Sequence, residues 1–212
     1  MIYLPKALNF FVFFLCSLIA LFTLQQNFDY FVNEYPGQVF ILILTLIILI
    51  TILVLIYRSH IDHTKLLIVF IVLSFIIRTC FAYGINTPVE SDFLAMYDSA
   101  QKAAAGDFSW INNGYFRRWA YQVPFTLFET LLLKISPTIL FIKTINIIAM
   151  VFSNILIYCI ISHISSKKAG LAGFFIYMVY PQPLLLASVL TNQHCATTLF
   201  LLSVYLLIKG SH

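Results

Sequence analysis

Long uninterrupted apolar runs constrain this chain more than any other feature of its sequence. A membrane-spanning helix needs roughly 20 apolar residues, because each residue adds about 1.5 Å along the helix axis. Five runs satisfy this length and a sixth is near the lower limit; they cover about 7–24, 38–57, 66–84, 138–162, 170–190 and 194–208. The sequence therefore predicts an all-α polytopic membrane protein with about six transmembrane helices.

The composition supports this class and excludes several others. Hydrophobic residues make up 61% of the 212 residues, whereas charged residues make up only 9%. A soluble domain of this length could not bury so much apolar surface. Cytosolic enzymes, nucleic-acid-binding proteins and disulfide-rich secreted domains are therefore excluded, and the four cysteines show no CxxC spacing that would indicate a zinc site.

The basic residues predict the orientation of the chain. Six of them lie at the ends of the chain or in the turns after the second and fourth runs: Lys6, Arg58, Lys65, Lys167, Lys168 and Lys209. If these turns and ends face the cytoplasm, as the positive-inside rule requires, seven of the eight acidic residues lie on the other side. We therefore expect a multi-pass protein with both termini cytoplasmic and an outer loop over residues 85–137.

The outer loop is predicted to hold two short helices joined by an aromatic segment. Ser91 is expected to cap the first helix, and Gly106 to end it in a left-handed conformation. Its inner face is expected to carry Phe93, Met96, Tyr97, Ala100 and Ala104, opposite Asp98, Gln101 and Lys102. The second helix runs from Pro124 to Ile135, too short to cross a bilayer, so it is expected to lie in the membrane interface.

Two cations, Arg78 and Lys143, lie inside apolar runs near their outer ends. They either extend to head groups or pair with loop acids, or they bind the phosphate of a lipid-linked substrate, together with Arg117 and Arg118 of the loop. Lys143 shares one helix face with Asn146, Ser153 and Asn154, a pattern equally typical of hydrogen bonds that join helices.

Asp92 also has two interpretations. An acidic residue at a helix start is ordinarily a capping feature, because it interacts favourably with the helix dipole. A carboxylate a few residues after a span could instead take a proton from a hydroxyl group while nearby cations stabilise a departing phosphate. Glu90 and Asp98 are weaker candidates for this role.

An ordered set of motifs follows the third apolar run: Pro88-x-x-Ser91-Asp92-Phe93-x-x-x-Tyr97-x-x-Ala100, then Gly106-Asp107, then Tyr115-Phe116-x-x-Trp119-x-Tyr121-Gln122-x-Pro124. Together they resemble the first part of the bacterial GT-C membrane glycosyltransferases, relatives of the protein mannosyltransferases and the lipid A aminoarabinose transferases. In this resemblance, Asp92 matches the catalytic carboxylate and residues 121–135 match a second juxtamembrane helix. Lys167-Lys168-Ala-Gly170 matches a basic turn before a helix that ends near Tyr180-Pro181.

The resemblance also implies how the chain is divided. Residues 66–212 correspond to the front module of the family, and residues 1–65 add two N-terminal transmembrane helices. Family members are usually considerably longer. We therefore expect the chain to be a truncated product, lacking a C-terminal portion, or half of a split enzyme with a second subunit.

The activity that the resemblance implies is an inverting transfer of a sugar from a polyprenyl-phosphate donor to an acceptor hydroxyl, at the outer face of a bacterial plasma membrane. Asp92 is then the general base, and the lipid phosphate departs toward Arg78, Arg117, Arg118 or Lys143. Trp119 and Tyr121 either stack on sugar rings or belong to an interfacial aromatic belt.

No cofactor is required by this resemblance, although some members use a divalent metal. Asp92 and Glu90 could contribute to a metal site, but the sequence shows no complete ligand set. The alternative to an enzyme is a non-catalytic membrane scaffold or lipid-phosphate-binding protein. A transporter is less consistent with the pattern, since the charges gather near the outer interface and the two halves of the chain show no repeat.

Overall fold

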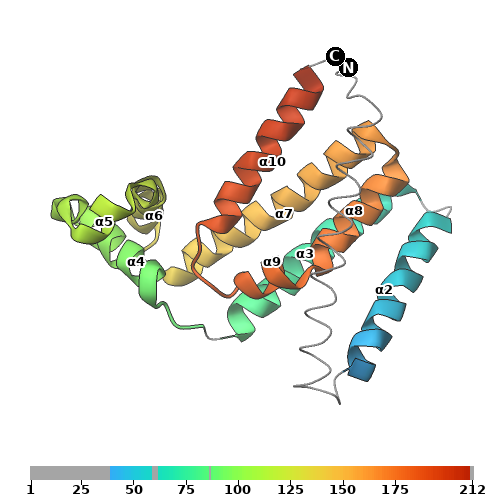
Figure 1. Cartoon of the computed structure of the whole chain (residues 1–212), viewed down its shortest axis with the longest axis horizontal. Coiled ribbons are helices and arrows are strands. Elements are labelled where there is room, and N and C mark those ends of the chain that lie inside the picture. The colour runs from blue at the N-terminus through green and yellow to red at the C-terminus, as the bar shows by residue number, and fades with distance from the viewer. Residues whose placement is uncertain (1–38, 59–61, 86, 211–212) are drawn as a thin grey trace. The chain divides into compact units, whose positions relative to one another are not determined.

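A computed structural model describes residues 39–58, 62–85 and 87–210, and every regular element within these ranges is a helix (Figure 1). The chain divides after Arg58 into two compact units. The first contains helix α2 (Val39–Arg58), which corresponds to the predicted span 38–57. The predicted span 7–24 lies outside the described residues.

The second unit is built around helix α7 (Ile139–Ile164), which packs against α3 (His63–Gly84), α8 (Lys167–Val179) and α10 (Gln193–Gly210). Within the described ranges, α3 and α7 are the two helices that are long and apolar enough to cross a membrane. Both match predicted spans. The all-helical class is therefore confirmed, whereas six spanning helices are not evident in the described part of the chain.

The predicted span 170–190 is wrong as a single helix. The structure ends α8 at Val179 and begins a separate short helix, α9 (Pro181–Leu186). Tyr180 has an extended backbone with φ −62° and ψ 125°, because a residue before proline is disfavoured in the helical conformation. With 13 residues, α8 is roughly 20 Å long, shorter than the hydrocarbon core of a bilayer at about 30 Å.

Close packing of α7 against α8 depends on two glycines. A Cβ atom added at Gly170 would overlap Ser162 Oγ and would lie 2.8 Å from the carbonyl oxygen of Tyr158. A Cβ atom at Gly173 would overlap the side chain of Ile161. The two backbones approach more closely here than any residue with a side chain would permit.

The predicted outer-loop helices are confirmed as α4 (Ser91–Ala104) and α6 (Val123–Ile135). Gly106 has φ +92°, the left-handed conformation expected after the first helix. Between them, the aromatic segment folds into a short helix α5 (Gly114–Arg118) and two 3-10 turns, η2 (Ser109–Asn112) and η3 (Ala120–Gln122).

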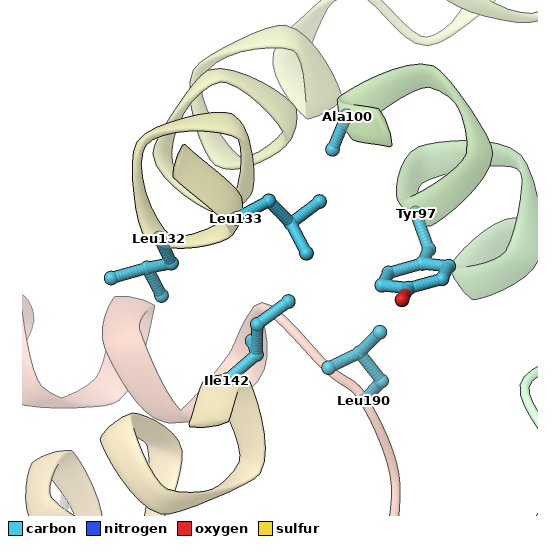
Figure 2. Packing of buried hydrophobic residues seen from close by; sticks show 6 residues of the cluster. All are labelled: Tyr97, Ala100, Leu132, Leu133, Ile142 and Leu190. Carbon is cyan, nitrogen blue, oxygen red and sulfur yellow. The ribbon is translucent and has the colours of Figure 1, made fainter. Parts of the chain in front are cut away.

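The predicted outer loop, with α4, α5 and α6, is here called the outer layer. A cluster of buried apolar side chains packs it against α7 and the segment before α10 (Figure 2). It joins α4, α6, α7 and the segment before α10 through Tyr97, Ala100, Leu132, Leu133, Ile142 and Leu190. A second cluster, inside the outer layer itself, contains Met96, Ala103, Trp110, Phe116 and Phe125. The buried face of α4 is therefore close to the predicted one, with Ala103 fully buried and Ala104 only partly so.

Polar side chains lie inside the second unit, and many apolar ones lie on its surface. Helix α3 buries Ser74 and Arg78, and α7 buries Lys143, Asn146, Ser153 and Asn154. The exposed apolar side chains of the same two helices include Ile68, Val72, Ile76, Leu140, Ile148 and Phe152. A soluble protein shows the opposite distribution, whereas helices in lipid direct polar groups toward one another.

Candidate functional site

Asp92 lies exposed in the first turn of α4, and its carboxylate makes no hydrogen bond or ion pair with any other described residue. The expectation that Ser91 caps this helix is wrong. Glu90 occupies the N-cap position without a side-chain hydrogen bond, and Ser91 is the first residue of α4, with a left-handed φ of +53°. A positive φ is uncommon for a non-glycine residue and strains the backbone directly before Asp92.

Tyr115 of α5 lies within electrostatic range of Asp92. Burial raises the pKa of the Tyr115 phenol, and the nearby negative charge of Asp92 and the ionisable Tyr121 raise it further. The Tyr115 hydroxyl is buried and forms no hydrogen bond with a described residue. Phe93, the neighbour of Asp92, packs with Tyr115 against the apolar core of the outer layer. Asp92 and Tyr121 therefore each lie within electrostatic range of Tyr115.

A mostly apolar cavity of about 590 Å³ lies between η3, α6, α7 and the start of α10. Its wall includes Phe125 and Phe128 of α6, whose ring centres are 6.1 Å apart, and Ile148 and Phe152 of α7. Tyr121 lines the same cavity and lies within electrostatic range of Tyr115. Tyr121 is therefore the residue of η3 that both lines the cavity and lies near Tyr115.

The cavity contains few polar groups: Tyr121, Asn192, Cys195 and Thr198. Asn192 donates a hydrogen bond of 2.6 Å to the side-chain oxygen of Gln122. This hydrogen bond joins η3 to the segment before α10. This cavity was not predicted, because its walls come from segments about 70 residues apart that meet only in the folded chain.

Arg78 lies in the interior of the bundle and not at the outer surface. It is completely buried, and its guanidinium donates to Ser74 Oγ at 2.6 Å, Asn154 Oδ1 at 3.2 Å and the Tyr177 carbonyl at 3.3 Å. Asn154 also donates to Ser74 Oγ. Arg78 therefore joins α3, α7 and α8 through neutral acceptors, and it makes no ion pair with a described acid of the loop.

The polar face predicted for α7 is present, and most of its side chains form hydrogen bonds with neighbouring segments of the bundle. Asn146 donates to the Thr191 carbonyl, and Ser153 forms a hydrogen bond of 2.8 Å with Thr198. Lys143 is also buried, at 6% exposure, but it makes no hydrogen bond or ion pair with a described residue. It is therefore a buried cation without a described partner, near the N-terminal end of α7.

Arg117, Arg118, Trp119 and Tyr121 lie together on the outer layer with exposed side chains. The rings of Trp119 and Tyr121 meet edge to face, with centres 5.9 Å apart. The exposed candidate substrate-binding residues thus lie in one short segment, residues 117–121, which runs from the end of α5 into η3. The structure separates them from Arg78, which belongs to the helix-joining network.

Glu129 of α6 is a buried acidic residue that the sequence analysis did not single out. Its exposure is 1%, and its Oε2 atom makes no hydrogen bond within the described part of the chain. Burial raises the pKa of this carboxyl to about 8. Its spacing from Thr126 and Thr130 places three polar residues on one face of an apolar helix, a signal that could have identified it.

No group of three or more histidine, cysteine or acidic side chains in the described ranges could hold a metal ion. Asp92 and Glu90 therefore do not form a metal site with other described residues. Comparison of the chain with family models, with curated proteins and with solved structures finds no match.

Proposed function

We propose that this chain transfers a sugar from a polyprenyl-phosphate donor to an acceptor hydroxyl at the outer face of a bacterial plasma membrane. The observation that carries the proposal is an exposed carboxylate, Asp92, that bonds to no other described residue, on the same layer of short helices as Tyr121, which lines an apolar cavity. A lipid-linked sugar needs both features: a polar reaction site and an adjoining apolar space for its chain.

The cavity suits an apolar chain in both size and lining. Its volume of about 590 Å³ falls within the range of about 300–1,000 Å³ that is typical of ligand pockets. Leu127, Leu131 and Ile135 form an exposed apolar stripe on α6, the same helix that lines the cavity. This stripe supports the placement of α6 in the membrane interface, where a lipid substrate could enter from the side.

In the proposed reaction, the acceptor oxygen attacks the anomeric carbon, and the bond between this carbon and the phosphate oxygen breaks. Asp92 accepts the proton of the acceptor hydroxyl, and the polyprenyl phosphate departs with the bonding electron pair. Arg117 and Arg118 are exposed and can offer charge-assisted hydrogen bonds to this phosphate. Buried Lys143 and Arg78 would add positive charge from within the bundle.

The proposal is tested by assaying the purified full chain in liposomes with polyprenyl-phosphate sugars and a hydroxyl acceptor. We expect release of polyprenyl phosphate. The variant Ala196→Phe, which places a ring in the cavity, should reduce release at least tenfold, whereas Leu207→Phe on the exposed face of the same helix should not. Binding of the donor without turnover would instead support the alternative, a lipid-phosphate-binding protein.

The proposal also requires residues 85–137 to face outward, with both termini and the turn between α7 and α8 in the cytoplasm. In a cysteine-free background, a cysteine replacing exposed Asp98 should react with a membrane-impermeant maleimide in intact cells. A cysteine replacing exposed Ser166, the N-cap of α8, should react only after lysis. The reverse pattern would contradict both the orientation and the proposed reaction site.

A further inference from the structure

The two longer helices of the outer layer carry different charges on their exposed faces. Helices α4 and α6 pack against each other through their buried faces, so their exposed faces point away from one another. The exposed face of α4, with the residues at its two ends, carries four acids and one cation: Glu90, Asp92, Asp98, Asp107 and Lys102. The exposed face of α6 carries no acid, because Glu129 of this helix is buried.

The exposed face of α6 is apolar and is accompanied by cations. Its apolar residues follow one another at intervals of three or four residues: Pro124, Leu127, Leu131 and Ile135. Lys134 lies on the same face, and the segment before α6 adds Arg117, Arg118 and the exposed ring of Trp119. This combination of apolar, aromatic and basic side chains is typical of a helix that lies on a membrane surface.

The cavity indicates which way the exposed face of α6 points. Pro124 lines the cavity from α6, and Ile148 and Phe152 line it from α7. All three residues are also exposed. Ile148 and Phe152 belong to the exposed apolar surface of α7, a helix long and apolar enough to cross a membrane. The exposed face of α6 therefore borders a surface that contacts hydrocarbon when α7 spans the bilayer.

We propose that the exposed face of α6, together with Arg117, Arg118 and Trp119, binds the head groups of anionic membrane phospholipids. Guanidinium and ammonium groups form charge-assisted hydrogen bonds with the phosphate of a head group. An anionic membrane surface attracts these cations and repels the acids of α4, so both faces favour one orientation of the outer layer, with the exposed face of α4 toward water.

This inference does not depend on sugar transfer. The proposed reaction assigns Arg117 and Arg118 to the departing phosphate of the donor, whereas binding of phospholipids needs no donor. A test without any sugar donor therefore examines the phospholipid surface by itself.

Trp119 reports which lipids lie beside this surface, because bromine on an acyl chain quenches tryptophan fluorescence only at close range. The full chain is placed in nanodiscs of equal amounts of anionic phosphatidylglycerol and neutral phosphatidylcholine, with bromine on the chains of one lipid or the other. Trp110, the second of the two tryptophans, is buried and is replaced by phenylalanine. Quenching by brominated phosphatidylglycerol should exceed quenching by brominated phosphatidylcholine by at least about twofold, because each cation near an anionic surface contributes to the attraction.

A variant that combines Arg117→Gln, Arg118→Gln and Lys134→Gln should bring the quenching ratio close to about one, since it removes the cations that attract the anionic lipid. Lys102→Gln, the matched change on the exposed face of α4, should retain the ratio. If Trp110→Phe does not fold, the ratio is measured with both tryptophans, since buried Trp110 adds fluorescence that either brominated lipid quenches weakly.

The proposal is overturned by equal quenching from the two lipids in the unmodified surface, or by a ratio that persists in the triple variant. Added inorganic phosphate should leave the ratio unchanged. Loss of the ratio on adding phosphate would mean that the cations form a site for free phosphate and not a surface for phospholipids. Each of these results would leave the sugar-transfer hypothesis untouched.

Discussion

Replacing Asp92 by asparagine should lower the rate of sugar transfer by about 10²–10⁴-fold, the usual contribution of a general base. Asparagine keeps the size of the side chain but cannot accept the proton of the acceptor hydroxyl. Because the Asp92 carboxylate bonds to no other described residue, this change should leave the folded structure intact. Turnover is measured as polyprenyl phosphate released by the purified chain in liposomes.

Asp98 provides the matched control for this change. It is an exposed acid on the same helix, and Asp98→Asn alters the net charge by the same amount. We expect Asp98→Asn to transfer sugar at a rate within about twofold of the unmodified chain, since surface substitutions of this kind are usually near neutral. Donor binding should be similar in both variants. Transfer by Asp92→Asn at the unmodified rate would show that Asp92 is not the base.

The outer layer was largely predictable from local sequence signals. The spacing of Met96, Tyr97 and Ala100 identified the buried face of α4, and Gly106 marked its end. The start of α6 was predicted at Pro124, one residue after its observed start at Val123. These features depend on neighbouring residues, so the sequence alone contains the necessary information.

The sequence predictions failed in two situations. In one, contacts between segments distant in sequence decide the structure; in the other, a local signal, a proline, was given too little weight. Hydropathy made residues 170–190 one span, although Pro181 within it ends the helix; the helix end near Tyr180-Pro181 that the family resemblance implied agrees with the observed end of α8 at Val179. The role of Arg78 depends on Asn154 and Tyr177, which are distant in sequence, so its interior position could not be deduced from α3 alone. The cavity was missed for the same reason.

Gly170→Val should destabilise the second unit by about 3 kcal/mol, the upper part of the usual range for overpacking. The added side chain would overlap Ser162 Oγ and crowd the carbonyl oxygen of Tyr158, a backbone atom that cannot rotate away. Relief would require α8 to move away from α7. Such a shift would also weaken the Arg78 hydrogen bond to the Tyr177 carbonyl. Thermal unfolding of the detergent-solubilised chain, followed by circular dichroism, measures the loss.

Two variants separate this packing effect from the effect of valine on helix formation. An added Cβ atom at Gly114 in α5 meets no atom within 4 Å, so Gly114→Val should change stability by less than about 0.5 kcal/mol. The Ser162 hydroxyl is buried and bonds to no residue in the described ranges, so Ser162→Ala alone should cost little. Combined with Gly170→Val, it should restore part of the lost stability, because it removes one of the two obstructing atoms. Equal destabilisation by both glycine substitutions would mean that α7 and α8 do not pack as closely as the structure indicates.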